Sequence, residues 1–220
     1  MHSAMQSDLP SVPPITVSVV VPVYSGADYL VALIAEIERV RNSWTDSGAP
    51  LRLVEAILVD DAAVDSSSEL AERLAREKEW VTVLHLARNF GQHPATIAGI
   101  LHTSGDWIIT LDEDLQHPPA RIEDMLRIAV RDGHDIVYAN PHSPVHQSHI
   151  RDFGSRLYKR LMQSITGNTQ IATFNSFRLV RGSIARAAAS VCGHDTNFDV
   201  SLSWFTQRVT ALPMDLKDQR

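Results

Sequence analysis

Runs of apolar residues alternate with helical patterns through the first 140 residues of the chain. The first run, Thr16–Val23, is rich in valine and lacks polar alternation, which is typical of a strand buried on both faces of a parallel sheet. Further runs of this kind cover Leu53–Val59, Val81–Leu86, Trp107–Leu111 and Ile136–Ala139. We therefore expect five strands in this part of the chain.

Between these runs, apolar residues recur at the spacing of one helix face. The expected helices cover Leu30–Val40, Ser66–Lys78, Pro94–Thr103 and Pro119–Arg131. Strands that alternate with helices of about ten to fifteen residues form β-α-β units. The pattern thus predicts an α/β fold with a mostly parallel central sheet flanked by helices.

The pattern changes after Asn140. A loop rich in Pro, His and Ser precedes Arg151–Ile165, where Phe153, Leu157, Leu161 and Ile165 form an apolar stripe and four basic residues lie mostly off it. This spacing predicts an amphipathic helix. A strand at Ile171–Val180, a helix at Ser183–Val191 and a strand at Arg208–Pro213 are expected to follow.

Composition excludes several classes of protein. The 220 residues carry 20 Lys and Arg against 26 Asp and Glu, so the formal net charge is -6, which argues against a general nucleic-acid binder. The single cysteine, Cys192, excludes an internal disulfide framework and a cysteine-rich zinc site. No run approaches the roughly 18 apolar residues of a membrane-spanning helix, and residues 1–14 read as a loose tail without a signal peptide. We expect a cytoplasmic protein.

Acidic residues follow two of the expected strands, at the sheet edge where open α/β folds bind ligands. Asp60 and Asp61 follow the second strand, and Asp112, Glu113 and Asp114 follow the fourth. A single Asp in such a place is commonly a helix N-cap, but three adjacent acids repel one another unless a cation relieves the repulsion. Hard oxygen ligands select Mg²⁺ or Mn²⁺. In extended backbone Asp112 and Asp114 point the same way, so we expect them to share one metal ion, or one metal ion and one sugar hydroxyl.

The chain has neither the glycine-rich turn of dinucleotide-binding proteins nor the phosphate-binding loop of nucleotide triphosphatases. A nucleotide diphosphate held through a metal, as in sugar transfer, is what remains. Four segments then resemble family 2 glycosyltransferases of the GT-A fold, and most closely their polyprenyl-phosphate branch, such as dolichyl-phosphate mannose synthase and undecaprenyl-phosphate aminoarabinose transferase. They are SVVVPVYSGADYL, ILVDDAAVDSS, LARNFGQHPATIAGI and GDWIITLDEDLQHPP.

The resemblance implies a hexosyltransferase, inverting in its stereochemistry, with a role for each matching residue. Pro22 and Tyr24 would line the nucleobase pocket, Asp60 and Asp61 would hold base and ribose, and Asp112 and Asp114 would grip the metal and diphosphate. Gln116 would lie beside the sugar or acceptor phosphate, and Arg178, in NSFRLV, would face phosphate. The implied catalytic residues are Asp114, Gln116 and Arg178. Residues 15–220 would form one domain, with the nucleotide-sugar and metal half at 15–140 and an acceptor half at 141–220 that ends early.

The implied acceptor is a polyprenyl phosphate. A phosphate monoester is already an anion near neutral pH, so it needs no general base, and the chain shows no obvious one. The basic helix at Arg151–Ile165 is suited to anionic headgroups, and Arg151 and Arg178 are the expected contacts to the acceptor phosphate. We therefore expect peripheral attachment to the inner face of the cell membrane, with a UDP- or GDP-linked sugar as donor.

Two departures from the family pattern keep alternatives open. The family usually has Asn-Glu where this chain has Ser25-Gly26, and Gly-Ser-x-Asp where it has Ala62-Ala63-Val64-Asp65. One alternative is a saccharide acceptor, with Asp195 or Asp199 as the base, and another is a non-catalytic module that binds sugar nucleotides. The histidines are expected to be structural or solvent-exposed, and His117 is the best exception as a ligand because it follows the acidic cluster. The oligomeric state stays open, a homo-oligomer included.

Overall fold

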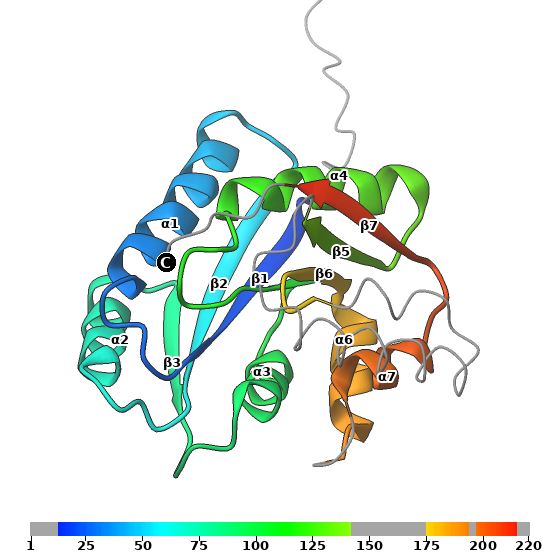
Figure 1. The fold of residues 1–220 in the computed structure, drawn as a ribbon. Coiled ribbons are helices and arrows are strands. Elements are labelled where there is room, and N and C mark those ends of the chain that lie inside the picture. Colours follow the sequence, from blue (N-terminus) through cyan, green and yellow to red (C-terminus); the bar gives the residue numbers. More distant parts are fainter. Residues whose placement is uncertain (1–12, 142–174, 194–196, 215–220) are drawn as a thin grey trace, which may run out of the picture.

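The computed structural model describes residues 13–141, 175–193 and 197–214. Within these residues a seven-stranded sheet crosses the molecule with helices on both faces (Figure 1). The strands are β1 (Ile15–Val23), β2 (Leu51–Asp60), β3 (Val81–His85), β4 (Trp107–Thr110), β5 (Ile136–Pro141), β6 (Arg178–Arg181) and β7 (Val209–Met214). The helices are α1 (Leu30–Asp46), α2 (Ser67–Glu77), α3 (Gln92–Leu101), the 3₁₀ turn η1 (Pro119–Arg121), α4 (Ile122–Asp132), α6 (Gly182–Val191) and α7 (Phe198–Ser203).

The sheet has the strand order β3-β2-β1-β4-β6-β5-β7. β1 lies beside β2 and β4, β2 lies beside β3, and β5 lies beside β7, all as parallel pairs. β6 is antiparallel to both of its neighbours, β4 and β5. The mostly parallel sheet predicted from the sequence is confirmed, and the antiparallel insertion of β6 is the feature that the apolar pattern did not reveal.

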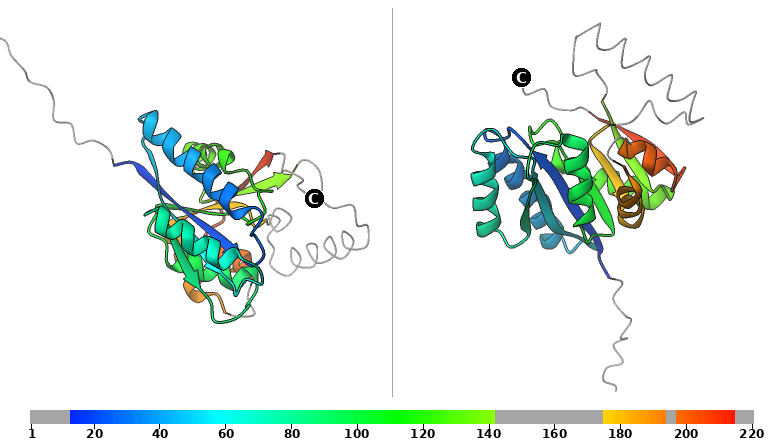
Figure 2. Two further views of the ribbon diagram at one scale, coloured as in Figure 1. Left: turned by 90° about the vertical axis from the view of Figure 1, so that its left-hand side faces the viewer. Right: turned by 90° about the horizontal axis from the view of Figure 1, so that it is seen from below.

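β1 shows why its valine run has no polar alternation. Val17, Val19, Val21 and Val23 belong to the core cluster that α1, α2 and α4 cover, whereas Val20 belongs to the opposite cluster, under α3, α6 and α7. All five side chains are fully buried. Helices therefore cover both sides of this strand, and the three layers are visible from two directions (Figure 2).

The elements predicted from the sequence are present over most of the described residues, with three differences. α1 continues to Asp46, because buried Trp44 packs in the core and its Nε1 donates to Glu123 Oε2 at 2.9 Å. The short helix α7 was not predicted. β6 begins at Arg178, whereas a strand was expected from Ile171, of which residues 171–174 lie outside the described residues. The expected helix at 151–165 also lies outside them.

Asp135 joins β5, β6 and β7 at the edge where β5 begins. Its side chain is 1% exposed and accepts hydrogen bonds from Arg181 Nε at 2.7 Å, Arg208 Nε at 2.8 Å and Thr206 Oγ1 at 2.7 Å. Burial alone would raise the pKa of Asp135, but these hydrogen bonds outweigh burial and hold the pKa below its usual value. The ionised carboxylate is therefore a stabilising tie in the second half of the sheet.

Replacing Asp135 by Asn tests this tie. We expect Asp135→Asn to lower the free energy of unfolding at pH 7 by about 1–3 kcal/mol. This is less than the cost of breaking a fully buried ion pair, because both arginines are partly exposed to solvent. A carboxylate whose pKa is lower in the folded than in the unfolded protein stabilises the fold at pH values above its unfolded pKa. This stabilisation is lost as the pH falls through the folded pKa. Urea unfolding at pH 7 and pH 3 should thus show a smaller difference between wild type and variant at pH 3. Asp132→Asn, at an exposed pair with Arg131, is the control, and an equal effect of both substitutions would contradict the role of Asp135.

Gly99 sets the distance between α3 and the sheet. A Cβ at this position would lie 2.5 Å from Val20 Cγ1 and 2.9 Å from Val59 Cγ2, both in fully buried side chains. We expect Gly99→Ala to destabilise the fold by about 1–3 kcal/mol, as overpacked cores do. Thermal unfolding of Gly99→Ala in wild-type and Val20→Ala backgrounds measures the coupling. Equal losses in the two backgrounds would show that Val20 does not limit the approach of α3.

Candidate active site

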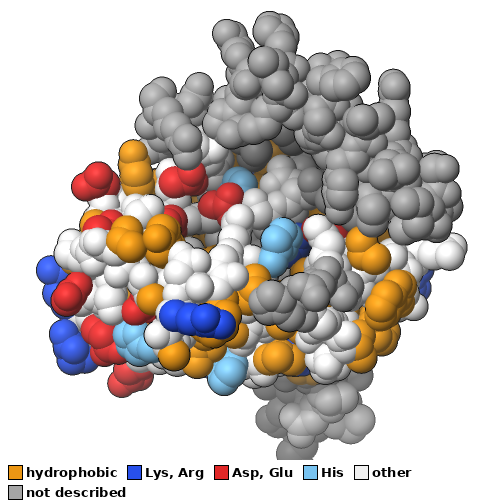
Figure 3. Space-filling model, turned by 60° about the horizontal axis from the view of Figure 1, so that its bottom comes forward, with side chains coloured by type: hydrophobic (Ala, Val, Ile, Leu, Met, Phe, Trp, Pro, Cys, Tyr) orange, Lys and Arg blue, Asp and Glu red, His pale blue; other side chains and the backbone are white. Residues whose placement is uncertain are grey.

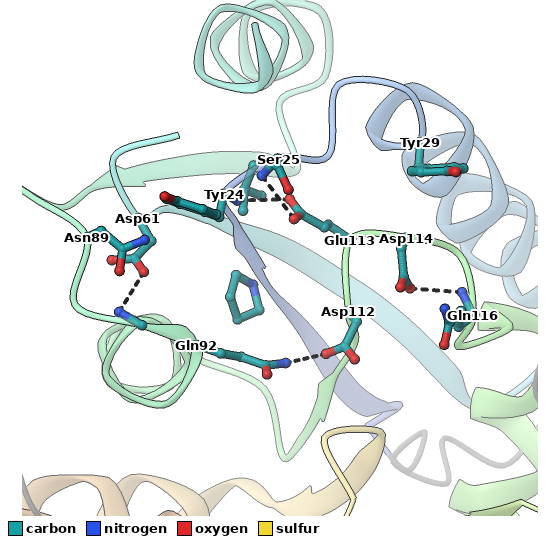
Figure 4. Close-up of a pocket in the computed structure, with 13 residues that line it drawn as sticks. Tyr24, Ser25, Tyr29, Asp61, Asn89, Gln92, Asp112, Glu113, Asp114 and Gln116 are labelled. Carbon is teal, nitrogen blue, oxygen red and sulfur yellow. Dashed lines mark hydrogen bonds between the residues drawn. The ribbon is translucent and has the colours of Figure 1, made fainter. Parts of the chain in front are cut away.

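A pocket of about 500 Å³ opens at the carboxyl ends of the parallel strands (Figure 4). Its walls come from the end of β1, the end of β2, the loop before α3 and the acidic segment after β4. The lining residues are Pro22, Val23, Tyr24, Ser25, Tyr29, Asp61, Asn89, Gly91, Gln92, Asp112, Glu113, Asp114 and Gln116. Six residues assigned from the sequence are thus brought together, namely Pro22, Tyr24, Asp61, Asp112, Asp114 and Gln116.

The three acids after β4 turn toward different partners. β4 ends at Thr110, Glu113 and Asp114 lie in a turn, and Leu115 has a φ of 61°. The expectation that extended backbone aligns Asp112 with Asp114 was therefore wrong. A left-handed conformation costs a non-glycine residue about 1–2 kcal/mol, and such strain is characteristic of functional sites.

Asp112 is held from three sides. Its carboxylate accepts hydrogen bonds from Gln92 Nε2 and, at 3.0 Å, from Ser176 Oγ, at the entrance to β6. Its backbone N–H donates to His117 Nδ1 at 3.0 Å. Burial lowers the pKa of His117, whose ring stacks on Phe177 with centroids 4.9 Å apart. A neutral His117 that accepts at Nδ1 carries its proton on Nε2, 3.6 Å from Asp112 Oδ2, so it supports Asp112.

Asp61 and Asp60 have different surroundings, although they are adjacent. The carboxylate of Asp61 accepts from Phe90 N at 2.7 Å and Gly91 N at 2.8 Å, and it lines the pocket. Asp60 is absent from the lining. It accepts from Ala63 N and Ser68 Oγ, each at 2.8 Å, and pairs with His85 Nδ1 at 2.8 Å. The geometry makes Asp60 a support of the loop after β2, in place of the base or ribose contact expected from the sequence.

Ala62 follows these two acids with a φ of 55°. It stands where the resembled family usually has glycine, which adopts this conformation at little cost. The loop after β2 therefore makes a left-handed turn at a residue with a Cβ, which costs about 1–2 kcal/mol relative to glycine.

Arg178 does not line the pocket. It is 2% exposed, its Nη1 lies 2.7 Å from Asp199 Oδ1, and its guanidinium covers the ring of Phe198 at 4.9 Å. Tyr138 Oη also donates to Asp199 Oδ1, at 2.9 Å. The structure thus places Arg178 in a buried pair, contrary to the expected phosphate contact, and commits Asp199, a candidate base, to the same pair. Arg151 and Asp195 lie outside the described residues.

Several lining residues had no role assigned from the sequence. Asn89 and Gln92 lie in the resembling segment LARNFGQHPATIAGI, and that segment was the signal that could have found them. Glu113 was visible only as a member of the acidic cluster. Tyr29 lies in the resembling segment SVVVPVYSGADYL, but no role was assigned to it because a tyrosine at the start of a helix is unremarkable in a sequence.

The pocket carries four carboxylates, from Asp61, Asp112, Glu113 and Asp114, and no Lys, Arg or His among the described residues that line it. Acidic side chains also gather on the left of the face shown in Figure 3. Asp112 and Asp114 offer hard oxygen donors that suit Mg²⁺ or Mn²⁺. No group of three His, Cys, Asp or Glu side chains able to hold a metal occurs in the described part of the chain. A bound cation there would need further ligands, and Mg²⁺ ordinarily takes them from substrate phosphates and water.

Among the described residues, no helix combines the length and apolar character needed to cross a membrane.

Solved structures share this fold. Glucosyl-3-phosphoglycerate synthase from Mycobacterium tuberculosis, crystallised with Mn²⁺, UDP-glucose and phosphoglyceric acid, matches with a TM-score of 0.66 and 13% identity over 94% of this chain and 72% of its own. TarS 1–349 of S. aureus in complex with UDP-GlcNAc matches with a TM-score of 0.61 and 14% identity over 94% of this chain and 60% of its own. These likenesses establish the GT-A fold predicted from the sequence.

Curated relatives are more similar in sequence. The undecaprenyl-phosphate 4-deoxy-4-formamido-L-arabinose transferase of Klebsiella pneumoniae is 33% identical over 204 residues, which cover 92% of this chain and 60% of the relative. The enzyme of that name from Edwardsiella ictaluri is 34% identical over 199 residues, which cover 90% of this chain and 59% of the relative. The chain thus spans about 60% of the length of these relatives. The signature described as Glycosyl transferase family 2 matches residues 18–188, so the chain belongs to that family.

Proposed function

We propose that this chain carries the catalytic site of a metal-dependent glycosyltransferase that moves a sugar from a nucleotide-diphosphate donor to a polyprenyl phosphate. The observation that carries the proposal is the pocket at the sheet edge, which has four carboxylates and no basic side chain among its described lining residues. A nucleotide diphosphate is an anion, and such a pocket would repel it unless a cation lay between them. The named activity of the curated relatives supports the same acceptor class.

The donor would lie along the pocket from β1 to the acidic segment. Pro22 and Tyr24, at the end of β1, offer apolar surface to the base, and Asp61 lies beside them to accept from ribose hydroxyls. Asp112 and Asp114 would hold the cation against the diphosphate. Asp112 accepts from Gln92 and Ser176, and Asp114 accepts from the Gln116 N–H. An ionised carboxylate has about four acceptor sites, so each one has lone pairs left for a metal.

The chemistry is one displacement at the anomeric carbon. An oxygen of the acceptor phosphate forms a bond to that carbon while its bond to the donor diphosphate breaks, and the configuration inverts. A bound divalent cation supplies neutralisation of the charge on the leaving diphosphate. Gln116 lines this end of the pocket, where its amide can donate to the acceptor phosphate or the sugar. No proton has to leave the ionised acceptor, so the chain needs no general base.

The buried pair of Arg178 with Asp199 favours a phosphate acceptor over a saccharide. A saccharide hydroxyl needs a base, and the carboxylate of Asp199 is 4% exposed and already accepts from Arg178 and Tyr138. Asp195 is then the remaining candidate base. For the phosphate acceptor, Arg151 stays the proposed contact, and the basic segment around it would attach the protein to the inner face of the cell membrane.

Donor binding is the first test. Isothermal titration with UDP, GDP and dTDP should detect binding of at least one nucleotide in Mn²⁺ and little binding without it. Asp114→Asn should weaken the Mn²⁺-dependent affinity by at least about tenfold, because a metal ligand is lost. Glu77→Gln, at an exposed position on α2, is the matched control. Equal binding with and without Mn²⁺ would refute the proposal. No binding of any nucleotide would also refute it, and would exclude the sugar-nucleotide binding module as well.

Acceptor chemistry is the second test, with the sugar conjugate of whichever nucleotide binds. Labelled sugar should pass into the organic phase with undecaprenyl phosphate and stay in water with undecaprenol, which lacks the phosphate. The transfer rate should rise with pH as the acceptor phosphate loses its second proton, with a pKa of about 6, and then level off. The variant Asp195→Asn should keep the wild-type rate. Transfer to undecaprenol, or loss of transfer in Asp195→Asn, would show that a base is needed. A protein that binds the nucleotide and transfers nothing would be a binding module.

A further inference from the structure

Glu113 lies between the two proposed metal ligands, but its carboxylate turns to the loop after β1 (Figure 4). Its Oε2 accepts from Tyr24 N at 2.9 Å and its Oε1 accepts from Ser25 N at 3.0 Å. One carboxylate thus bonds two successive backbone N–H groups, an arrangement that fixes the direction of the loop. Both carboxylate oxygens of Glu113 are thus engaged by backbone N–H groups of this loop.

The side chain of Glu113 occupies the space next to Gly26. A Cβ at position 26 would lie 2.5 Å from Glu113 Oε2, 3.0 Å from its Cδ and 3.1 Å from its Cβ. Among the described residues, the glycines with positive φ are Gly48, Gly91 and Gly133, so the backbone at position 26 does not require glycine. The residue is small because Glu113 fills the space where its side chain would be. Ser25-Gly26 and Glu113 therefore belong to one fitted contact.

Tyr24, Ser25 and Glu113 all line the pocket. Tyr24 is 39% exposed there, and its backbone N–H is one of the two groups that Glu113 binds. Without this carboxylate, two N–H groups lose their acceptor, and the loop that presents Tyr24 would have to be ordered by the ligand. That ordering would reduce affinity.

Resting on the proposed function, we infer that Glu113 is a positioning residue that fixes the loop at residues 24–26 and so shapes the nucleoside half of the donor pocket, with Gly26 as its required partner. Glu113 acts through Tyr24 and Ser25, whereas Asp112 and Asp114 act on the diphosphate half. The family usually has Asn-Glu where this chain has Ser25-Gly26. In this chain the carboxylate beside the loop would then be that of Glu113, from the acidic segment.

The sharpest test compares two probes on Glu113→Gln, an isosteric variant whose amide can accept one of the two N–H groups but not both. We expect the affinity for the nucleotide that binds wild type in Mn²⁺ to fall about tenfold. The affinity for inorganic pyrophosphate in Mn²⁺, which lacks a nucleoside, should stay within about twofold. Asp114→Asn is the control that should weaken both probes. If Glu113→Gln weakens both probes equally, it is a metal ligand, and if it weakens neither, the loop does not depend on it; both results overturn the inference.

A second measurement tests the fitted contact without any ligand. Gly26→Ala should lower the melting temperature by about 3 °C or more, because the added Cβ collides with Glu113. In a Glu113→Ala background the same substitution should cost much less, since the colliding atoms are gone. Equal losses in both backgrounds would overturn the pairing. Failure of wild type to bind any nucleotide would instead refute the proposed function, so the two failures are distinguishable.

Discussion

The crowding of carboxylates at one edge of the sheet is the constraint around which this site is built. Backbone N–H groups neutralise part of that charge, because Asp61 accepts from Phe90 and Gly91 while Glu113 accepts from Tyr24 and Ser25. Each of these contacts ties a loop to the pocket wall. Asp112 relies on side-chain donors instead, so it can bind a cation without unfolding a loop. The carboxylates thus have two effects: Asp61 and Glu113 order the loops through their backbone N–H groups, and Asp112 is left able to bind a cation.

The sequence predicted the first half of the fold well, because a strand buried on both faces appears as a continuous apolar run without polar alternation. The run of valines in β1 could belong to no exposed strand, and the acids after β2 and β4 necessarily meet at the edge of a parallel sheet. The second half was harder. β6 is four residues long and α7 six, too short for periodicity to define them, and the antiparallel direction of β6 depends on pairing with β4 and β5 that no local pattern encodes.

The candidate site was predictable as a set of residues and less so as a geometry. Six assigned residues line the pocket, but three adjacent acids look alike in a sequence. The turn at Glu113 and Asp114, with Leu115 at a positive φ, separates them. The same limit applies to Asp60 and Asp61, because only the structure shows that Asp60 faces Ser68 and His85 while its neighbour faces the pocket. Arg178 was misplaced for a related reason, since a motif cannot tell a buried arginine from one that faces a ligand.

Arg178 still bears on the site through the strand that it anchors. Its pair with Asp199 fixes α7 against β6 and leaves the start of β6 beside the acidic segment, where Ser176 Oγ donates to Asp112 at 3.0 Å. Thr110, at the end of β4, donates through its hydroxyl to the carbonyl of Ser176. The antiparallel strand therefore brings the second half of the chain directly to a proposed metal ligand. A change in the packing of α7 would reach Asp112 through β6, so the buried pair of Arg178 and Asp199 is linked through this strand to a proposed metal ligand.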